Sequence, residues 1–129
     1  MALKLEVIEL TTASIENSLR FYALLDVPVP TPEMGEDHVE AVLPSGLKIS
    51  WDTIELMKQI NPDWVDPVGH RIGLAFQCES PSAVNGKYQE VLENGFAGKS
   101  APWDAFWGQR YAQVIDPDGN IIDLFAPLS

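Results

Sequence analysis

The sequence predicts an α+β fold of two βαβββ modules, whose strands form a curved mixed sheet around a cleft while the helices pack outside. Three observations support this prediction. Segments of alternating polar and apolar residues, typical of strands, flank two capped segments with apolar residues at helical spacing. The same order of segments occurs twice along the chain. The 129 residues, 46% of them hydrophobic, suffice for one buried core, so we expect a single domain.

The repeat holds through strand, cap and helix. A shift of 66 residues superimposes residues of similar character: Ile8 on Leu74, Leu10 on Phe76, Thr12 on Cys78, Ser14 on Ser80, Tyr22 on Tyr88 and Leu25 on Val91. Such self-similarity is typical of duplicated modules. We place the modules at about residues 1–60 and 68–129, with a connector near 54–68 that Pro62 and Pro67 interrupt.

The first half is expected to contain one helix and three strands that the pattern identifies. Residues 3–10 alternate as in a strand. Ser14 is a suitable N-cap for a helix that ends before Pro28, because proline disfavours a helical residue before it. Residues 38–43 and 47–53 then form a predicted hairpin around a Pro-Ser-Gly turn.

The second half repeats this plan. Residues 70–78 form an apolar predicted strand, and Ser80 followed by a proline is a typical helix start. The helix should stop at Asn94-Gly95. Residues 109–116 and 120–125 are predicted strands joined by an Asp-Pro-Asp-Gly turn, which has proline and glycine where a turn needs them.

The net charge of −11, from 19 acidic and 8 basic residues, limits the classes of partner. Nucleic acid is not expected, because phosphate binding needs a surface of lysine and arginine. The acidic excess serves either solubility alone or a field that attracts a cationic ligand, and the sequence leaves both open.

A membrane location and secretion are not expected either. The sequence has no run of 18 apolar residues, and it does not start with a charged segment followed by an apolar one. Cys78 is the single cysteine, so it cannot form an internal disulfide, which fits a reducing compartment. We expect a cytoplasmic protein.

Alternation on the first strand of each half indicates which side chains line the cleft. The larger apolar residues of these strands should pack against the helices. The opposite faces carry Glu9 in the first half, and Arg71, Gly73 and Ala75 in the second. Small residues leave space, and charges inside a cleft need partners or water. These faces are therefore expected to line a binding cleft.

Four tryptophans are a heavy load for a chain of 129 residues. Trp103, Phe106 and Trp107 cluster just before a predicted strand, and Trp51 lies on the hairpin of the first half. They either fill a core or dimer interface, or form an aromatic wall, beside acids, that stacks on a flat or cationic ligand. On the second interpretation the ligand-binding residues are Glu9, Trp51, Arg71, Trp103, Phe106, Trp107, Tyr111 and Asp123.

Three segments resemble the vicinal oxygen chelate superfamily, which contains glyoxalase I, extradiol dioxygenases, and the fosfomycin and bleomycin resistance proteins. They are residues 18–22 (SLRFY), 103–111 (WDAFWGQRY) and 116–124 (DPDGNIIDL). The resemblance covers nearly the whole chain and implies the two-module fold described above. It also implies a homodimer, since the bleomycin-type members generally form their clefts between two subunits.

The enzymes of this superfamily hold a divalent metal with His, Gln or Glu side chains from the first and last strands of each half. Carried over by the motifs, these positions fall on Val7, Gly73, Asp123 and approximately Trp51. A catalytic metal needs about three protein ligands, and only Asp123 offers a ligating side chain here. The resemblance therefore implies neither a metal nor another cofactor, and no catalytic residue.

The resemblance then favours the metal-free, bleomycin-resistance-like members, which sequester a compound and confer antibiotic resistance. On this hypothesis the protein binds a cationic or aromatic, drug-like small molecule. The alternative is a metal-dependent lyase, isomerase or dioxygenase of the glyoxalase type, with shifted ligands such as Glu9, Asp52 or His38. A structural or regulatory domain with the same fold is a third class that stays open.

Overall fold

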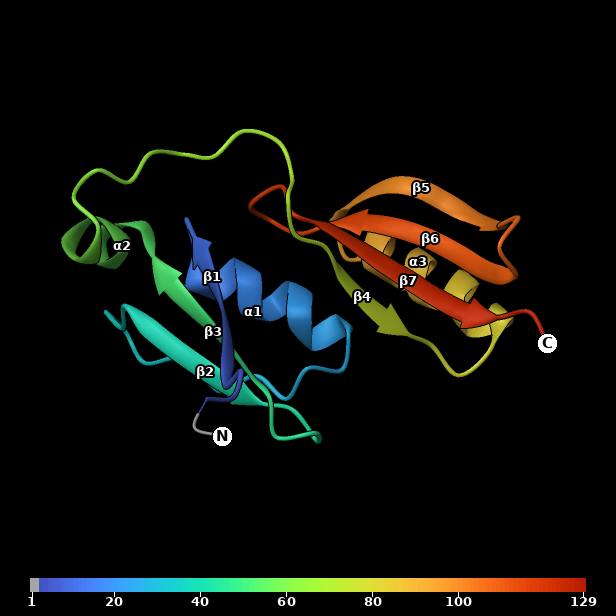
Figure 1. Ribbon diagram of the computed structural model, residues 1–129, viewed down its shortest axis with the longest axis horizontal. Coiled ribbons are helices and arrows are strands. Elements are labelled where there is room, and N and C mark those ends of the chain that lie inside the picture. The colour runs from blue at the N-terminus through green and yellow to red at the C-terminus, as the bar shows by residue number, and fades with distance from the viewer. Residues whose placement is uncertain (1–2) are drawn as a thin grey trace. The chain divides into compact units, whose positions relative to one another are not determined.

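The computed structural model describes residues 3–129. Within these residues the chain divides into two compact units, Met1–Pro67, with a sheet and two helices, and Val68–Ser129, with a sheet and a single helix (Figure 1). Both sheets combine parallel with antiparallel strand pairs, which confirms the predicted α+β class with mixed sheets. No helix within residues 3–129 is long and apolar enough to cross a membrane.

The first unit is built on a three-stranded sheet. Its elements are, in order, β1 (Val7–Thr12), α1 (Ile15–Leu24), β2 (His38–Val42), β3 (Lys48–Thr53) and α2 (Ile54–Ile60). Strand β3 is central in the order β1-β3-β2, parallel to β1 and antiparallel to β2. Helix α1 lies against one face of this sheet (Figure 1).

Helix α1 supplies much of the core of the first unit. Ser14 accepts a hydrogen bond from the backbone N–H of Asn17 at 3.1 Å, which is the N-cap that the sequence predicts. Phe21 and Tyr22 are fully buried, and the Tyr22 ring centre lies 5.6 Å from that of Trp51 on β3. Alternate residues of β3 therefore point towards α1, and the residues between them point away.

The first unit has fewer strands than the expected module. Residues 28–37, between α1 and β2, form no strand, so this unit has three strands within residues 3–67. Pro28, Pro30 and Pro32 explain the difference, because a proline has no backbone N–H to donate to a strand ladder.

The start of the expected connector is a helix. Residues 54–60 form α2, whereas the sequence interpretation assigns them to a connector near 54–68. The Thr53 side chain accepts a hydrogen bond from the backbone N–H of Leu56 at 3.1 Å and so caps the helix. The irregular part of the connector begins after α2 and contains Pro62 and Pro67. These residues interrupt regular structure because proline has no backbone N–H to donate.

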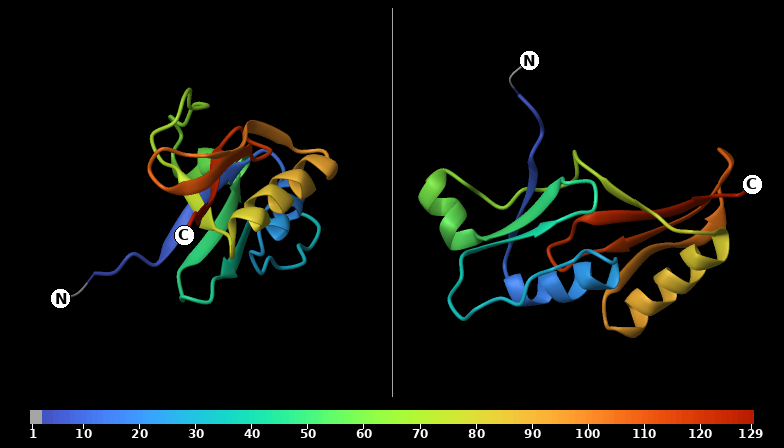
Figure 2. Two further views of the ribbon diagram at one scale, coloured as in Figure 1. Left: turned by 90° about the vertical axis from the view of Figure 1, so that its right-hand side faces the viewer. Right: turned by 90° about the horizontal axis from the view of Figure 1, so that it is seen from below.

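The second unit has the expected βαβββ order. Its elements are β4 (Leu74–Gln77), α3 (Pro81–Glu93), β5 (Ala97–Asp104), β6 (Gln109–Ile115) and β7 (Ile121–Pro127). The sheet order is β4-β7-β6-β5, with β4 parallel to β7 and the other neighbours antiparallel. Helix α3 runs along one face of this sheet (Figure 2).

Two strands of the second unit differ from the sequence prediction. Strand β4 begins at Leu74, not at residue 70, because residues 70–73 are exposed and end in Gly73, which weakens strand pairing. The alternating pattern does not identify residues 97–104, where β5 lies. Two register shifts interrupt the pairing of β5 with β6, so its side chains do not follow a simple period of two.

The core of the second unit lies between α3 and its sheet. The buried side chains on these elements include Val84, Val91, Ala112, Val114, Ile122 and Leu124. A Cβ on Gly98 of β5 would come within 2.4 Å of the Tyr88 hydroxyl, so a glycine is needed where α3 approaches β5. The face of the sheet that α3 leaves uncovered carries the candidate site.

Candidate ligand-binding site

The candidate site lies on the face of the second sheet turned away from α3. In β6 the buried Ala112 and Val114 point towards α3, so Tyr111 and Gln113 point to the opposite side. In β7 Asp123 has a buried neighbour on either side and shares that side of the sheet. We call this site the aromatic–carboxylate face, defined by Trp103, Phe106, Trp107, Tyr111, Gln113 and Asp123.

Three aromatic rings gather round Trp107, all in edge-to-face geometry. The distances from the Trp107 ring centre are 4.9 Å to Phe106, 5.1 Å to Tyr111 and 5.6 Å to Trp103. The indole N–H of Trp107 donates a hydrogen bond to Gln109 Oε1 at 2.7 Å, which fixes its orientation. Phe106 is 91% exposed, Trp107 46% and Trp103 40%, so these rings present apolar surface to the outside of the unit.

The turn between β5 and β6 causes this projection. Gly108 adopts a positive φ of 95°, a conformation that glycine reaches without steric cost. Its backbone N–H donates to the Ala105 carbonyl at 3.0 Å, and the N–H of Ala105 donates to the Gln109 carbonyl at 2.8 Å. This tight turn places Phe106 and Trp107 at the end of the sheet.

Polar groups lie beside the rings. The side-chain amide of Gln113 donates to Asp123 Oδ1 at 2.9 Å and approaches the Tyr111 hydroxyl at 3.3 Å. Burial, followed by the hydrogen bond and the charge of Asp123, raises the pKa of Tyr111 to about 12. Tyr111 therefore stays protonated at neutral pH, and the only charge of this group of three side chains is that of the Asp123 carboxylate.

Of the eight ligand-binding residues that the sequence predicts, the structure brings five together on the aromatic–carboxylate face: Trp103, Phe106, Trp107, Tyr111 and Asp123. The prediction for Trp51 needs correction. Trp51 is fully buried against Tyr22, and its indole N–H has no hydrogen-bond partner. It is a core residue of the first unit, because its position on β3 faces α1. Glu9, on β1 of that unit, and Arg71, which precedes β4, are both exposed.

Gln113 is a residue of the site that the sequence interpretation misses. It lies two residues after Tyr111 on β6 and directly opposite Asp123 on β7. The period of two along a strand is the signal that could have found it, since Tyr111 alone places Gln113 on the same face.

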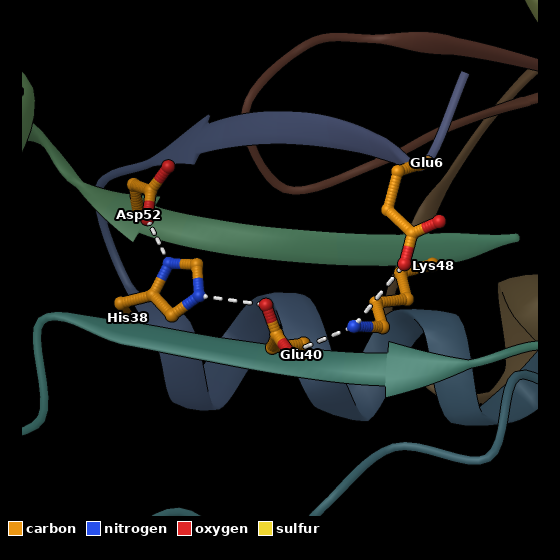
Figure 3. Close-up of polar contacts among 5 residues, drawn as sticks. All are labelled: Glu6, His38, Glu40, Lys48 and Asp52. Carbon is orange, nitrogen blue, oxygen red and sulfur yellow. Dashed lines mark hydrogen bonds and ion pairs between the residues drawn. The ribbon is translucent and has the colours of Figure 1, made fainter. Parts of the chain in front are cut away.

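A second group of polar side chains lies on the face of the first sheet turned away from α1 (Figure 3). His38 Nδ1 lies 2.5 Å from Asp52 Oδ1, and His38 Nε2 lies 3.1 Å from Glu40 Oε2. Lys48 Nζ lies 3.9 Å from Glu40 and 3.5 Å from Glu6. The hydrogen bond that His38 donates to the Asp52 carboxylate is the largest cause that raises the pKa of His38, and Glu40 adds to it.

A groove adjoins this group of side chains at the edge strand β2. Its volume is about 380 Å³, and it is lined by Pro30, Thr31, Glu33, Glu36, His38, Val39 and Glu40. Three of the seven lining residues are glutamates, so the groove adds to the acidic character of this side of the first unit.

The strand registers change one of the metal-ligand positions that the family resemblance implies. Glu9 lies opposite Ser50 in the β1–β3 pair. Ala75, which the repeat superimposes on Glu9, lies opposite Asp123 in the β4–β7 pair. Ser50 is therefore the counterpart of Asp123, and the assignment to Trp51 is wrong by one residue, which on a strand means the opposite face.

The residues at these positions do not fit a divalent metal. Val7 and Gly73 have no donor atom in their side chains, and Ser50 offers a neutral hydroxyl. Asp123 alone is a carboxylate, and it already accepts a hydrogen bond from Gln113. Within residues 3–129 no three His, Cys, Asp or Glu side chains gather as a metal site, where about three protein ligands are needed.

Solved structures share this fold. Protein SA1046 from S. aureus matches with a TM-score of 0.81 at 15% identity, covering 98% of this chain and 94% of that one. A glyoxalase-related enzyme from Fulvimarina pelagi has a TM-score of 0.82 at 17% identity, covering 95% and 87%. A glyoxalase/bleomycin resistance protein/dioxygenase family enzyme from Burkholderia phytofirmans PsJN has a TM-score of 0.79 at 17% identity, covering 98% and 100%. At these identities the similarity shows the fold alone.

Sequence comparison identifies the family. Among curated proteins no sequence match is found. The family model of the glyoxalase/bleomycin resistance protein/dioxygenase superfamily matches residues 4–124, nearly the whole length of the chain. The chain therefore belongs to the glyoxalase/bleomycin resistance protein/dioxygenase superfamily.

Proposed function

We propose that this superfamily member is a binding protein without a catalytic metal that holds a planar cationic or aromatic compound on the aromatic–carboxylate face. In this respect it resembles the bleomycin-resistance-like members, which sequester a compound. The observation that carries the proposal is the group of exposed rings around Trp107 with the Asp123 carboxylate on the same face. Rings bind flat surfaces, and the acid selects positive charge.

The polar contacts of this face support binding more than catalysis. Tyr111 has a raised pKa of about 12, far above the neutral range in which a general acid or base works best. The Asp123 carboxylate is held by the side-chain amide of Gln113, which donates to its Oδ1 at 2.9 Å. These properties are suited to a fixed negative charge that orients a ligand.

We also infer that the protein forms a homodimer, as the resemblance implies. The Phe106 ring is 91% exposed beside the partly exposed Trp107 and Trp103, and a contiguous apolar patch is commonly covered by a partner or a ligand. Light scattering at tens of micromolar protein should then give about twice the 14.3 kDa mass of one chain. A mass equal to one chain would count against the dimer and leave the ligand proposal standing.

Paired probes test the proposed function directly. The first is 1-methylquinolinium, a planar cation, and the second is 4-methylquinoline, which has the same number of heavy atoms and is neutral at about pH 8. The cation should bind saturably and more tightly, by about 1 to 3 kcal/mol, because it gains cation–π and Coulomb attraction. Its affinity should fall as salt is raised from low to physiological concentration.

Isothermal titration calorimetry measures both affinities. Its heat signal does not depend on tryptophan fluorescence, which light-absorbing quinolines would disturb. Equal affinity for the two probes would show that the acidic charge serves solubility only, and that the face selects flat rings irrespective of charge. If neither compound bound up to its solubility limit, the proposal would be wrong.

A further inference from the structure

One pair of facing residues in the first sheet occupies the same position as a pair in the second sheet, but its side chains differ. In the second sheet Gln113 lies opposite Asp123. In the first sheet Glu40 lies opposite Ser50, the counterpart of Asp123. Gln113 donates to Asp123, whereas Glu40 interacts with His38 and Lys48, and Ser50 is left without a donor or acceptor across the strand.

Ser50 is the one buried hydroxyl within residues 3–129 whose oxygen has no hydrogen-bond partner. Its residue is 0% exposed. Strand alternation places it on the side of β3 opposite to Trp51, which packs against α1. An unpaired buried polar atom is rare in a folded protein, and such an atom needs an explanation other than stability.

The surroundings of Ser50 are negative. Glu9 lies opposite on β1 and Glu40 opposite on β2, while Asp52 follows two residues later on the same face. Lys48 and His38 supply the positive charge, and both already contact Glu40. Glu9 has no ion pair or hydrogen bond among the contacts of the described residues, so one carboxylate and one hydroxyl on neighbouring strands are left for a ligand.

We propose that Glu9 and Ser50 form a second small-molecule site, on the first sheet, that takes an ammonium or guanidinium group carrying N–H donors. The exposed carboxylate of Glu9 supplies the opposite charge. The Ser50 oxygen, which neighbouring side chains cover, accepts an N–H of the ligand once those side chains move aside. Hydrogen bonds between a charged donor and such acceptors are among the stronger ones in proteins. The chemistry has a precedent on the same face, where the Lys48 ammonium lies between Glu6 and Glu40 (Figure 3).

This site does not depend on the aromatic–carboxylate face, because all of its residues belong to the first unit. It also uses chemistry that a purely electrostatic surface lacks. A negative face attracts every cation alike, whereas the Ser50 oxygen favours only cations that donate hydrogen bonds.

The test uses two cations without aromatic rings. Agmatine carries a guanidinium and an ammonium group, and hexamethonium, a bis-quaternary dication, has the same charge without any N–H. In ¹⁵N-labelled protein at constant ionic strength, agmatine should shift the backbone amide signals of Glu9, Ser50 and Glu40 saturably. Hexamethonium should shift them at least about tenfold more weakly, since it cannot donate to Ser50.

Variants then assign the effect to the two residues. Ser50→Ala and Glu9→Gln should each weaken agmatine binding by about tenfold. Glu93→Gln removes an exposed acid at the end of α3 and is the charge-matched control, which should bind normally. Ser50→Ala should not lower the melting temperature, because no hydrogen bond within the protein is lost.

Three results would overturn the site. They are equal binding of the two cations, unchanged agmatine affinity in both variants, and agmatine shifts confined to residues 103–111 or absent altogether. The binding of 1-methylquinolinium to Ser50→Ala separates this proposal from the proposed function. If 1-methylquinolinium binds Ser50→Ala as tightly as the wild-type protein, while agmatine does not bind the wild-type protein, the first-sheet site is wrong and the aromatic–carboxylate face still stands.

Discussion

Gln113 on β6 donates a hydrogen bond from its side-chain amide to Asp123 on β7 at 2.9 Å, and the two residues lie directly opposite each other in the sheet. The same amide lies 3.3 Å from the Tyr111 hydroxyl, so one side chain orients both the acid and the phenol. The carboxylate is thus held in place before a ligand arrives, which lowers the entropy that binding costs. Charge at this position should control which ligands bind.

Asp123→Asn should remove the preference for cations. Asparagine keeps the shape of the side chain without its charge, so the Kd for 1-methylquinolinium should rise about tenfold, or ~1.4 kcal/mol, while that for 4-methylquinoline stays within about twofold. The variant should also lower the pKa of Tyr111 from about 12, because Asp123 contributes to its rise. Calorimetry measures the first effect, and ultraviolet absorbance titration of the phenol measures the second.

The matched control for this variant is Asp63→Asn, which removes an exposed acid in the first unit. It should change neither the two affinities nor the titration of Tyr111. An equal loss of affinity for both probes in Asp123→Asn would show that Asp123 shapes the site and does not select charge.

Trp107→Ala should weaken 1-methylquinolinium binding by about tenfold or more, because it removes the ring that contacts the other three. The stability cost should be smaller than the about 3–5 kcal/mol typical of a buried aromatic side chain, since Trp107 is 46% exposed. Titration calorimetry and urea unfolding measure the two effects. The control is Trp64→Ala, which changes a tryptophan of the first unit outside the aromatic–carboxylate face and should leave the affinity unchanged. If Trp107→Ala bound the probe as tightly as the wild-type protein, these rings would not be part of the site.

Trp51 should behave as a core residue. Trp51→Ala should lower the free energy of unfolding by about 3–5 kcal/mol, because the fully buried indole packs on Tyr22. Trp51→Phe should cost much less, since it keeps a ring there and removes an indole N–H that has no partner. Urea unfolding followed by circular dichroism measures both. A loss of probe affinity in Trp51→Phe with unchanged stability would instead return Trp51 to the binding site.

His38 should make stability depend on pH. Contact with Asp52 and Glu40 raises its pKa in the folded protein above the ordinary 6.5, so protonated His38 favours folding. This contribution is complete below about pH 6.5 and is lost as the pH rises through the raised pKa of the folded state. Because the imidazole is 42% exposed, we expect about 0.5 kcal/mol, as for other pairs open to solvent.

The measurement compares the wild-type protein with His38→Gln at about pH 5.5 and about pH 8.5. Other titrating groups are common to both proteins, so the difference in unfolding free energy isolates His38. The variant should be less stable at the lower pH and nearly equal to the wild type at the higher one. A difference that grows with pH would contradict the assigned direction of the pKa shift.

Metal removal should have no effect on the protein. The positions that correspond to metal ligands in the superfamily enzymes include two residues without donor atoms, Val7 and Gly73. The purified protein should therefore contain far less than one equivalent of nickel, zinc, iron or manganese, and EDTA should not change its melting temperature. Stoichiometric metal whose removal lowers that temperature by several degrees would contradict the binding-protein proposal.

Sequence reasoning found the local features of this protein because local chemistry determines them. Ser14 and Ser80 cap helices wherever the following residues are helical, since each side chain accepts from a backbone N–H three residues later. The aromatic group was found for a similar reason. Trp103, Phe106 and Trp107 are close in sequence across one tight turn, so they are also close in space.

Features that bring together residues far apart in the sequence cannot be predicted in the same way. His38 and Asp52 are 14 residues apart, and only the antiparallel register of β2 and β3 places them opposite each other. Strand β5 was not identified because its register shifts break the alternation from which strands are recognised.

The difference between Trp51 and Ser50 shows where the sequence alone stops. Alternation predicted that residues 47–53 form a strand with two unlike faces, and it determined which residues share a face. It did not determine which face is buried against a helix. That was decided by the packing of Tyr22 against Trp51, which gives the large indole to the core. Because neighbouring residues of a strand point to opposite sides, the same contact turns Ser50, with Asp52 and Lys48, to the polar face of the sheet.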